Sequence, residues 1–366
     1  MLRGGLGMNP YERMQLVLKG KLDELDRVPC SPYTGVFTVD ALERAGVKWI
    51  DAFKTVDGMV KIIKAVHEHT GLESVTVGFD AIVEAEMLGL MPDFREKQAA
   101  RGKYIWPTIK VKGVTMSGRR LDTPADLDAV IPEDVAGAGR MPMLLEAVRR
   151  LHDEYYGEIP VCARVGGPFT ILAGYVMDTV QFMMKVATEP DVVKEFYDVF
   201  KRMTIEEVKL FFEAGADIVS VAEDGAGCDN LAPAQFRDIV KPRLKEIFDK
   251  SGANAMTMSG TAGPIIKDCA ELGAKIITVD EKTDVVKAKK DLEEVRPQHF
   301  MALAGDIPTI NVLAKGTPEQ VRNYVKDLIE RKGIELVSPG SDLFITTPLE
   351  NVKAMVDAVR EFGARK

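Results

Sequence analysis

Short apolar runs alternate with longer stretches of helical period along most of the chain. Six such runs occur after about residue 155, at 161–165, 218–222, 255–258, 276–279, 301–304 and 336–338. Two earlier runs, near 27–32 and 74–79, bring the total to eight. Parallel strands that are buried on both faces read as continuous apolar runs. Eight of them alternating with helices predict an α/β fold of the (β/α)8 TIM barrel type.

Amphipathic stretches follow most of these runs, and several open with proline or a polar capping residue. They cover residues 190–215, 233–251, 262–272, 318–332 and 348–362. Residues 94–124 break the rhythm, because Gly102, Gly113 and Gly118 separate β-prone segments there, and this predicts a hairpin insertion. No linker divides the chain. We therefore expect one barrel domain over residues 1–366, with an N-terminal helical extension before the first strand.

Composition and charge narrow the class of protein. With 46% hydrophobic and 28% charged residues, the chain of 366 residues can fill a large core. No apolar run approaches the roughly 18 residues of a membrane helix. The net charge is −8, and we expect no Lys/Arg cluster to break this balance, which argues against nucleic acid as a partner. We expect residues 1–7, which are glycine-rich and do not resemble a signal peptide, to be a disordered or non-native extension.

The four cysteines indicate a reducing compartment. Cys30, Cys162, Cys228 and Cys269 lie far apart and form no CxxC pair. This spacing is typical of a cytoplasmic protein whose cysteines are all free.

The candidate chemistry follows the apolar runs, because the reacting groups of such barrels come from the C-terminal ends of strands. The residues at these ends are Asp80, Arg164, Glu223, Asp224, Thr257, Met258, Ser259, Asp280, Glu281, Asp306 and Ser341. The set is acidic and lacks histidine, which argues against a His-centred catalytic triad. We expect Glu223, Asp80 and Asp224 to be catalytic, and Arg164, Thr257, Met258, Ser259, Asp280, Asp306 and Ser341 to bind substrate.

Each of these residues also has a purely structural interpretation. Acids such as Asp224 and Asp306 often cap the helix that follows a strand. Methionines such as Met258 usually fill the core. Arg164 stands before a Gly166-Gly167 turn, where a guanidinium can contact an anion in the mouth of the barrel.

Several motifs occur in a fixed order from Asn9 to the C-terminus. They are Glu12-Arg13 with Asp26-Arg27-Val28-Pro29, Phe79-Asp80 through Gly89, Gly167-Pro168-Phe169-Thr170, Gly215-Ala216-Asp217, and Thr347-Pro348-Leu349-Glu350-Asn351-Val352. Together they resemble the uroporphyrinogen decarboxylase superfamily. The segment from Val83 to Gly89 and the motif beginning at Thr347 are most similar to its corrinoid-dependent methyltransferases. The resemblance implies a barrel that exchanges a methyl group with cobalt held by a separate corrinoid protein.

The chain also departs from the pattern of this superfamily. Asp80 matches the residue that contacts pyrrole nitrogens in the decarboxylases, but their arginine-rich motif is absent around residues 30–37 and their histidine position is Ser341. In the branch that methylates the thiol of coenzyme M, a His-x-Cys-Gly motif and a later Cys hold zinc. The matching positions here are Thr257, Ser259 with Gly260, and Ser341. Neutral hydroxyls are poor zinc ligands, so we expect no metal at this position.

The resemblance implies an enzyme of the EC 2.1.1 class. Because the zinc ligands of the thiol-directed branch are missing, it favours a methoxylated aromatic compound as the methyl donor, as in O-demethylation. The enzyme's partners would be a corrinoid protein carrying cobalamin and a small methyl donor or acceptor, with no membrane or nucleic acid, and the chain itself could form a homodimer. One alternative is corrinoid-dependent methyl transfer that involves a pterin, an amine or a thiol. Another is a degenerate barrel that serves as a ligand-binding protein or scaffold.

Overall fold

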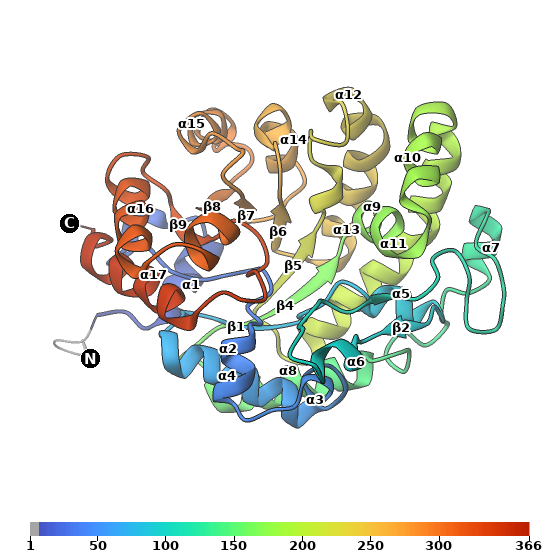
Figure 1. Cartoon of the computed structure of the whole chain (residues 1–366). Helices are drawn as coiled ribbons and strands as arrows, with labels where there is room; N and C mark the ends of the chain where they lie inside the picture. Colours follow the sequence, from blue (N-terminus) through green and yellow to red (C-terminus); the bar gives the residue numbers. More distant parts are fainter. Residues whose placement is uncertain (1–6, 366) are drawn as a thin grey trace.

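The computed structural model describes residues 7–365 and has seven parallel strands curled into a barrel (Figure 1). The strands lie side by side in chain order: β1 Val75–Val77, β4 Val161–Gly166, β5 Ile218–Ala222, β6 Ala255–Met258, β7 Ile276–Val279, β8 Ala302–Ile307 and β9 Leu336–Pro339. Each corresponds to an apolar run of the sequence, and every residue of these strands is buried. The predicted TIM barrel class is confirmed.

An irregular segment near Cys30 fills the eighth position of the barrel, between β9 and β1. Cys30 forms a single parallel bridge with Val337, and the Ser31 N–H donates to the Val337 carbonyl at 3.2 Å. On the other side the Glu73 N–H donates to the Cys30 carbonyl, and the Thr76 hydroxyl donates to the Pro32 carbonyl. This segment was expected to be a strand, but Pro29 and Pro32 have no N–H to donate, so no regular ladder forms.

Helices surround the strands (Figure 1). Those before β4 are α1 Pro10–Leu18, α2 Val39–Arg44, α3 Trp49–Lys54, α4 Val56–Thr70, α5 Val83–Met87, α6 Glu96–Ala99, α7 Pro124–Asp128 and α8 Met141–Tyr155. Those from β4 to β6 are α9 Pro168–Ile171, α10 Thr179–Thr188, α11 Pro190–Glu213, α12 Pro233–Gln235 and α13 Lys241–Ser251. Those that follow are α14 Ile266–Ala270, α15 Val285–Val295, α16 Pro318–Glu330 and α17 Leu349–Phe362. Short 3₁₀ turns are η1 Leu22–Glu24, η3 Asp224–Ala226 and η5 Gly263–Ile265, and π-helical turns are η2 Leu172–Val176, η4 Phe236–Val240 and η6 Thr309–Ala314.

Alternating residues of the strands divide the core into two clusters. One lies inside the barrel and contains Cys162, Ile218, Ala255, Ile276 and Leu336. The other fills the layer between the strands and the helices, and it contains the intervening residues such as Val219 and Met256. Because side chains along a strand alternate between its two faces, this division shows which side chain at each strand end points into the barrel.

A hairpin insertion follows α5, as expected. Its strands β2 Pro92–Asp93 and β3 Thr108–Ile109 pair antiparallel. The Trp49 indole N–H donates to the Phe94 carbonyl at 2.5 Å, and the Trp106 ring packs 5.4 Å from the Phe37 ring. These contacts attach the insertion to helix α3 and to the segment before α2.

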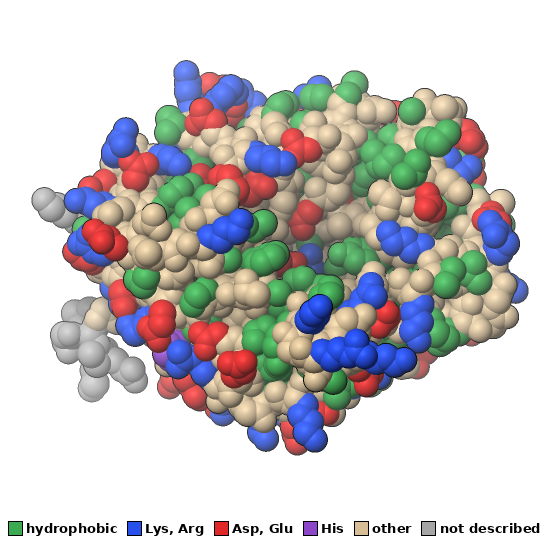
Figure 2. All heavy atoms as spheres, in the orientation of Figure 1, with side chains coloured by type: hydrophobic (Ala, Val, Ile, Leu, Met, Phe, Trp, Pro, Cys, Tyr) green, Lys and Arg blue, Asp and Glu red, His purple; other side chains and the backbone are tan. Residues whose placement is uncertain are grey.

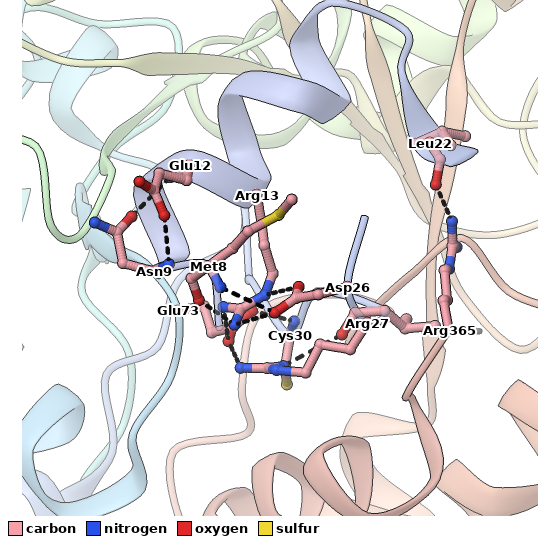
Figure 3. Close-up of polar contacts among 11 residues, drawn as sticks. Met8, Asn9, Glu12, Arg13, Leu22, Asp26, Arg27, Cys30, Glu73 and Arg365 are labelled. Atoms are coloured by element: carbon pink, nitrogen blue, oxygen red, sulfur yellow. Dashed lines mark hydrogen bonds and ion pairs between the residues drawn. The ribbon is translucent and has the colours of Figure 1, made fainter. Parts of the chain in front are cut away.

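Ion pairs join the N-terminal extension to the bottom of the barrel, where the strands begin. The Arg13 guanidinium contacts Asp26 at 2.7 Å and Glu73 at 3.0 Å, and Arg27 also pairs with Glu73 (Figure 3). The second oxygen of Glu73 accepts from the Cys30 N–H at 3.1 Å. This network ties α1 and the irregular closing segment to the residues that precede β1.

Two further sequence expectations can be compared with the described residues. All four cysteines are free, and between residues 7 and 365 no helix is both long and apolar enough to cross a membrane. Of the expected N-terminal extension, residues 1–6 lie outside the part that the structure describes.

Candidate active site at the barrel mouth

Buried hydroxyls line the barrel mouth, the end where the strands terminate. Ser220, Thr257 and Thr278 stand two residues after inward-facing Ile218, Ala255 and Ile276, so they point into the barrel. Their hydroxyls and that of Ser259 are buried without a hydrogen-bond partner. An unpaired buried polar group is costly, so a group of them marks a place for water or a ligand.

Arg164 is the only buried cation among the described strand residues, and it belongs to the same layer. One Nη atom lies 3.4 Å from an Asp342 oxygen and 3.8 Å from an Asp224 oxygen, while its Nε has no partner. Burial alone would lower the pKa of Arg164, but the carboxylates of Asp342, Asp224 and Glu84 outweigh it and raise this pKa. Arg164 therefore supplies a fixed positive charge with free hydrogen-bonding capacity.

Carboxylates hold the loops of the rim together. Asp224 accepts from the Ser259 N–H at 2.8 Å, Asp280 from the Gly260 N–H at 2.6 Å, and Asp342 from the Gly35 N–H at 2.7 Å. Burial raises the pKa of Asp280 and of Asp342 above the ordinary value. The face that carries these loops is hollowed near its centre, and both acidic and basic side chains lie in the hollow (Figure 2).

Four mouth residues were not identified from the sequence. Ser220 and Thr278 could have been found from the two-residue alternation along β5 and β7. Asp342 lies next to the expected Ser341, which is half-buried, in a loop without a repeating pattern. Tyr175 in η2 is also close enough to Arg164 and Asp342 to feel their charges, although burial is the main cause that raises its pKa.

The structure places Glu223 outside the mouth. It follows Val219 and Val221 on the outward face of β5, and it is completely buried. Its carboxylate accepts from the Phe169 and Thr170 N–H groups, the Thr170 hydroxyl and the Tyr197 hydroxyl, at 2.8–3.1 Å. Burial raises its pKa to about 7, against the effect of these hydrogen bonds. The expectation that this side chain points into the mouth does not hold, and its visible contacts fix the start of α9.

Asp80 is engaged by an arginine. Both of its oxygens accept from Arg140, at 2.9 and 2.8 Å, and the same guanidinium contacts Glu86 at 2.5 Å. Glu84, on the other side of α5, accepts from the Gly166 N–H at 2.5 Å, and its second oxygen is buried without a partner. Asp80 is thus held by a bidentate pair beside the mouth.

Two of the expected substrate-binding residues point into the layer between strands and helices. Met258 belongs to the outer core cluster. Asp306 accepts from the Tyr324 hydroxyl at 2.9 Å and lies 3.4 Å from the Lys332 ammonium group. The mouth therefore brings together Arg164, Asp224, Thr257, Ser259 and Asp280 from the expected set, and leaves Met258 and Asp306 behind the strands.

The donor atoms at the position that matches the zinc site of the thiol-directed enzymes do not suit zinc. Thr257 and Ser259 present neutral hydroxyls, whereas zinc prefers imidazole and thiolate. Among residues 7–365 no three His, Cys, Asp or Glu side chains are grouped to hold a metal ion.

Comparison with known proteins agrees with the fold and with the motifs. The chain is 28% identical over 356 residues to methylcobamide:CoM methyltransferase MtaA of Methanosarcina barkeri, covering 96% of this chain and 98% of that protein. It is 23% identical to uroporphyrinogen decarboxylase of Anaeromyxobacter dehalogenans, covering 87% and 89%. The solved structure of a methyltransferase from Methanosarcina mazei superposes with a TM-score of 0.85 at 26% identity, covering 97% and 99%. The family model for uroporphyrinogen decarboxylase matches residues 9–362, and the chain belongs to this family.

Proposed function

We propose that this chain is a corrinoid-dependent methyltransferase that moves a methyl group between a methoxylated aromatic compound and the cobalt of a partner corrinoid protein. The similarity to methylcobamide-dependent methyltransferases supports the class of reaction. The observation that carries the choice of substrate is the set of hydroxyls where, by resemblance, the thiol-directed enzymes hold zinc. Without a metal to lower the pKa of a thiol, a thiolate acceptor has no evident source at neutral pH.

The reaction sets a clear requirement for the protein. A reduced cobalt corrinoid supplies the nucleophile for the methyl carbon, the carbon–oxygen bond breaks, and its electron pair stays on the departing oxygen. The enzyme must stabilise that oxygen by a positive charge or a proton. The open hollow of the mouth suits a corrinoid that arrives on another protein. The four free cysteines favour the reducing environment of the cytoplasm as the place of this reaction.

Arg164 fits the first requirement, because it is a buried cation with an unpaired Nε inside the mouth. Asp342 is the candidate for the second, because burial raises its pKa above the ordinary value and so lowers the cost of a proton on this carboxyl. Asp224 lies next to both. The hydroxyls of Thr257, Ser259, Ser220 and Thr278 can then orient the aromatic substrate by hydrogen bonds. Asp80 and Glu223 were expected as proton donors from their positions at strand ends, but their oxygens are already engaged.

The test is methyl transfer to free cob(I)alamin from three groups of compounds: methoxyarenes, methylamines and methylated thiols. The proposal expects methylcobalamin from methoxyarenes, with the matching phenol as the second product. Transfer from amines or thiols alone would refute the choice of substrate while leaving the class of reaction intact. Absence of transfer from any donor, to free cobalamin and to corrinoid proteins of the source organism, would refute the class as well.

A further inference from the structure

The hairpin insertion concentrates positive charge. Residues 94–120, here called the insertion arm, hold eight of the 48 Lys and Arg residues and one of the 56 Asp and Glu residues of the chain. The arm carries a net charge of +7 in a protein of net charge −8. The expectation that no Lys/Arg cluster breaks the acidic balance of the chain is wrong for this segment. In the folded chain the cations gather over α6 and β2, at the lower right of Figure 2.

Most of these cations have no ion-pair partner among the described residues. Arg95 pairs with Asp93 and Arg120 with Asp122. The other six, for which the structure shows no ion pair, are Lys97, Arg101, Lys103, Lys110, Lys112 and Arg119. Like charges that are gathered and unpaired repel each other. Their arrangement therefore needs a reason outside the free molecule, and a negatively charged partner provides one.

Apolar side chains stand exposed beside the cations. Val111 and Met116 on the arm are 58% and 59% exposed, and Val180 and Met184 on α10 are 69% and 61% exposed. Between the arm and α10 lies a cleft of about 460 Å³, lined by Val111, Lys112, Arg120, Gln181 and Lys185 among others. A surface that combines apolar contacts with a charged rim is typical of protein interfaces.

The arm is fixed next to the barrel mouth. The Gly113 N–H donates to the Val176 carbonyl at 2.6 Å, and the Lys112 ammonium group donates to the Thr179 hydroxyl at 3.1 Å. Val176 directly follows Tyr175, which lies among the charged groups of the mouth. A protein that delivers a bound cofactor to this mouth can therefore contact the arm and α10.

We propose that the insertion arm and α10 form the docking surface for the corrinoid-carrying partner, and that the partner presents an acidic face to it. This inference rests on the proposed function. A nucleic acid would also be attracted by the charge, but proteins that bind single strands usually add exposed aromatic side chains on which bases stack. The arm turns its aromatic side chains inward: the Tyr104 ring lies 5.4 Å from the Trp49 ring, and Trp106 packs on Phe37. The exposed side chains are aliphatic, which favours a protein.

The test reverses three exposed charges of the arm, in the variant Lys97→Glu/Arg101→Glu/Lys110→Glu. Its matched control reverses three exposed and unpaired lysines on the outer helices α4, α11 and α15, in Lys61→Glu/Lys209→Glu/Lys290→Glu. Methyl transfer is measured with free cob(I)alamin and with corrinoid proteins of the source organism, purified and loaded with cobalamin. The dependence on ionic strength is recorded for each.

For the arm variant we expect kcat/KM with the corrinoid protein to fall about 10- to 100-fold at low salt, and its salt dependence to flatten. Rates with free cob(I)alamin should stay unchanged, and the control should behave as the wild type. Equal losses in the arm variant and the control, or unchanged transfer from the corrinoid protein, would overturn the docking proposal. If the wild type fails with every form of the cofactor, the proposed function itself fails.

A second variant guards against misfolding of the first. Val111→Ser/Met184→Ser keeps the charge, and both side chains are already exposed, so the fold should be retained by circular dichroism. We expect its KM for the corrinoid protein to rise several-fold at every salt concentration. An unchanged KM would remove the apolar half of the surface from the proposal. Tighter binding of a fluorescent single-stranded RNA than of the corrinoid protein, lost in the arm variant, would replace the protein partner with a nucleic acid.

Discussion

Two clusters of polar groups, one at each end of the barrel, are paired in opposite ways. At the bottom, Arg13, Arg27 and Glu73 are paired with one another, and Asp26 completes the network. At the mouth, the Nε of Arg164 and the hydroxyls of Thr257 and Ser259 are buried without partners. Paired groups hold the chain together, whereas a cluster of unpaired ones costs stability and marks a place for water or a ligand. We infer that the polar cluster at the bottom stabilises the fold and that the polar cluster at the mouth takes part in catalysis.

The largest effect on activity should come from Arg164→Met, which keeps the length of the side chain and removes the charge. Because the departing oxygen loses its positive neighbour, methyl transfer from methoxyarenes should slow by about 10²- to 10³-fold. Arg164→Lys keeps the charge and should recover part of the rate. The measurement is single-turnover methylation of cob(I)alamin. A loss below tenfold in the Met variant would show that the mouth does not work through this cation.

The largest effect on stability should come from the opposite end. Glu73→Gln leaves the buried Arg13 and Arg27 facing a neutral group, which should lower the free energy of unfolding by about 3–5 kcal/mol. Urea unfolding measures this, and the activity per folded molecule should equal that of the wild type. If the variant unfolds like the wild type but transfers methyl groups slowly, the polar cluster at the bottom serves activity and not stability, contrary to this account.

Glu223 sharpens the comparison, because it stands at the top of β5 but is paired as completely as the groups at the bottom. Burial raises its pKa from 4.5 to about 7, so the folded protein holds this proton more tightly than the unfolded chain does. The stability that Glu223 contributes is therefore full below pH 4.5 and is lost as pH rises toward 7. Glu223→Gln has no such titration.

We expect the stability of the wild type relative to Glu223→Gln to fall by about 3 kcal/mol between pH 4.5 and 7.5. Urea unfolding at both pH values measures it, with Glu213→Gln, at an exposed position on α11, as the control that should show no change. The rate of methyl transfer in Glu223→Gln should change little across aryl ethers of graded phenol pKa. A loss that grows with the basicity of the leaving group would return Glu223 to the role of proton donor.

The smallest expected effects come from two buried threonines, which form the most closely matched pair of positions at the two kinds of site. Thr76 on β1 donates to the Pro32 carbonyl at 3.2 Å, whereas Thr257 on β6 has no partner. Thr76→Val should lower the free energy of unfolding by about 1 kcal/mol and leave KM unchanged. Thr257→Val should not lower it, but should raise KM for the methoxyarene about fivefold. Equal effects of both variants on stability would show that the Thr257 hydroxyl has a structural partner after all.

Much of the fold could be predicted from the sequence, because buried parallel strands leave continuous apolar runs. The runs at 161–165 and 218–222 coincide with β4 and β5 to within one residue. The segment at 27–32 looked similar, but its prolines prevent a regular ladder. The amphipathic stretch at 233–251 divides into α12, a π-helical turn and α13, a change of helix type that helical periodicity does not reveal.

The site was less predictable, because it depends on which face of a strand each residue occupies. Thr257 and Ser259 share the inward face of Ala255, so alternation places them correctly. Glu223 lies one position out of phase with Ile218 and Ser220, and the same rule would have placed it outside the mouth. Asp342 belongs to a loop without periodicity, and the cations of the insertion arm come together only when the hairpin folds. Asp342 leaves no pattern along the chain, whereas the excess of cations at 94–120 is visible in the composition of that segment.

The most direct test of the account is methyl transfer by protein that has been stripped of metal with a chelator and assayed with free cob(I)alamin. Two reactions are compared: demethylation of a methoxyarene, and methylation of coenzyme M by methylcobalamin. We predict that demethylation continues at its full rate without metal and that the thiol is not methylated. The account would be contradicted if the thiol were methylated only when zinc is restored and the methoxyarene were not demethylated at all.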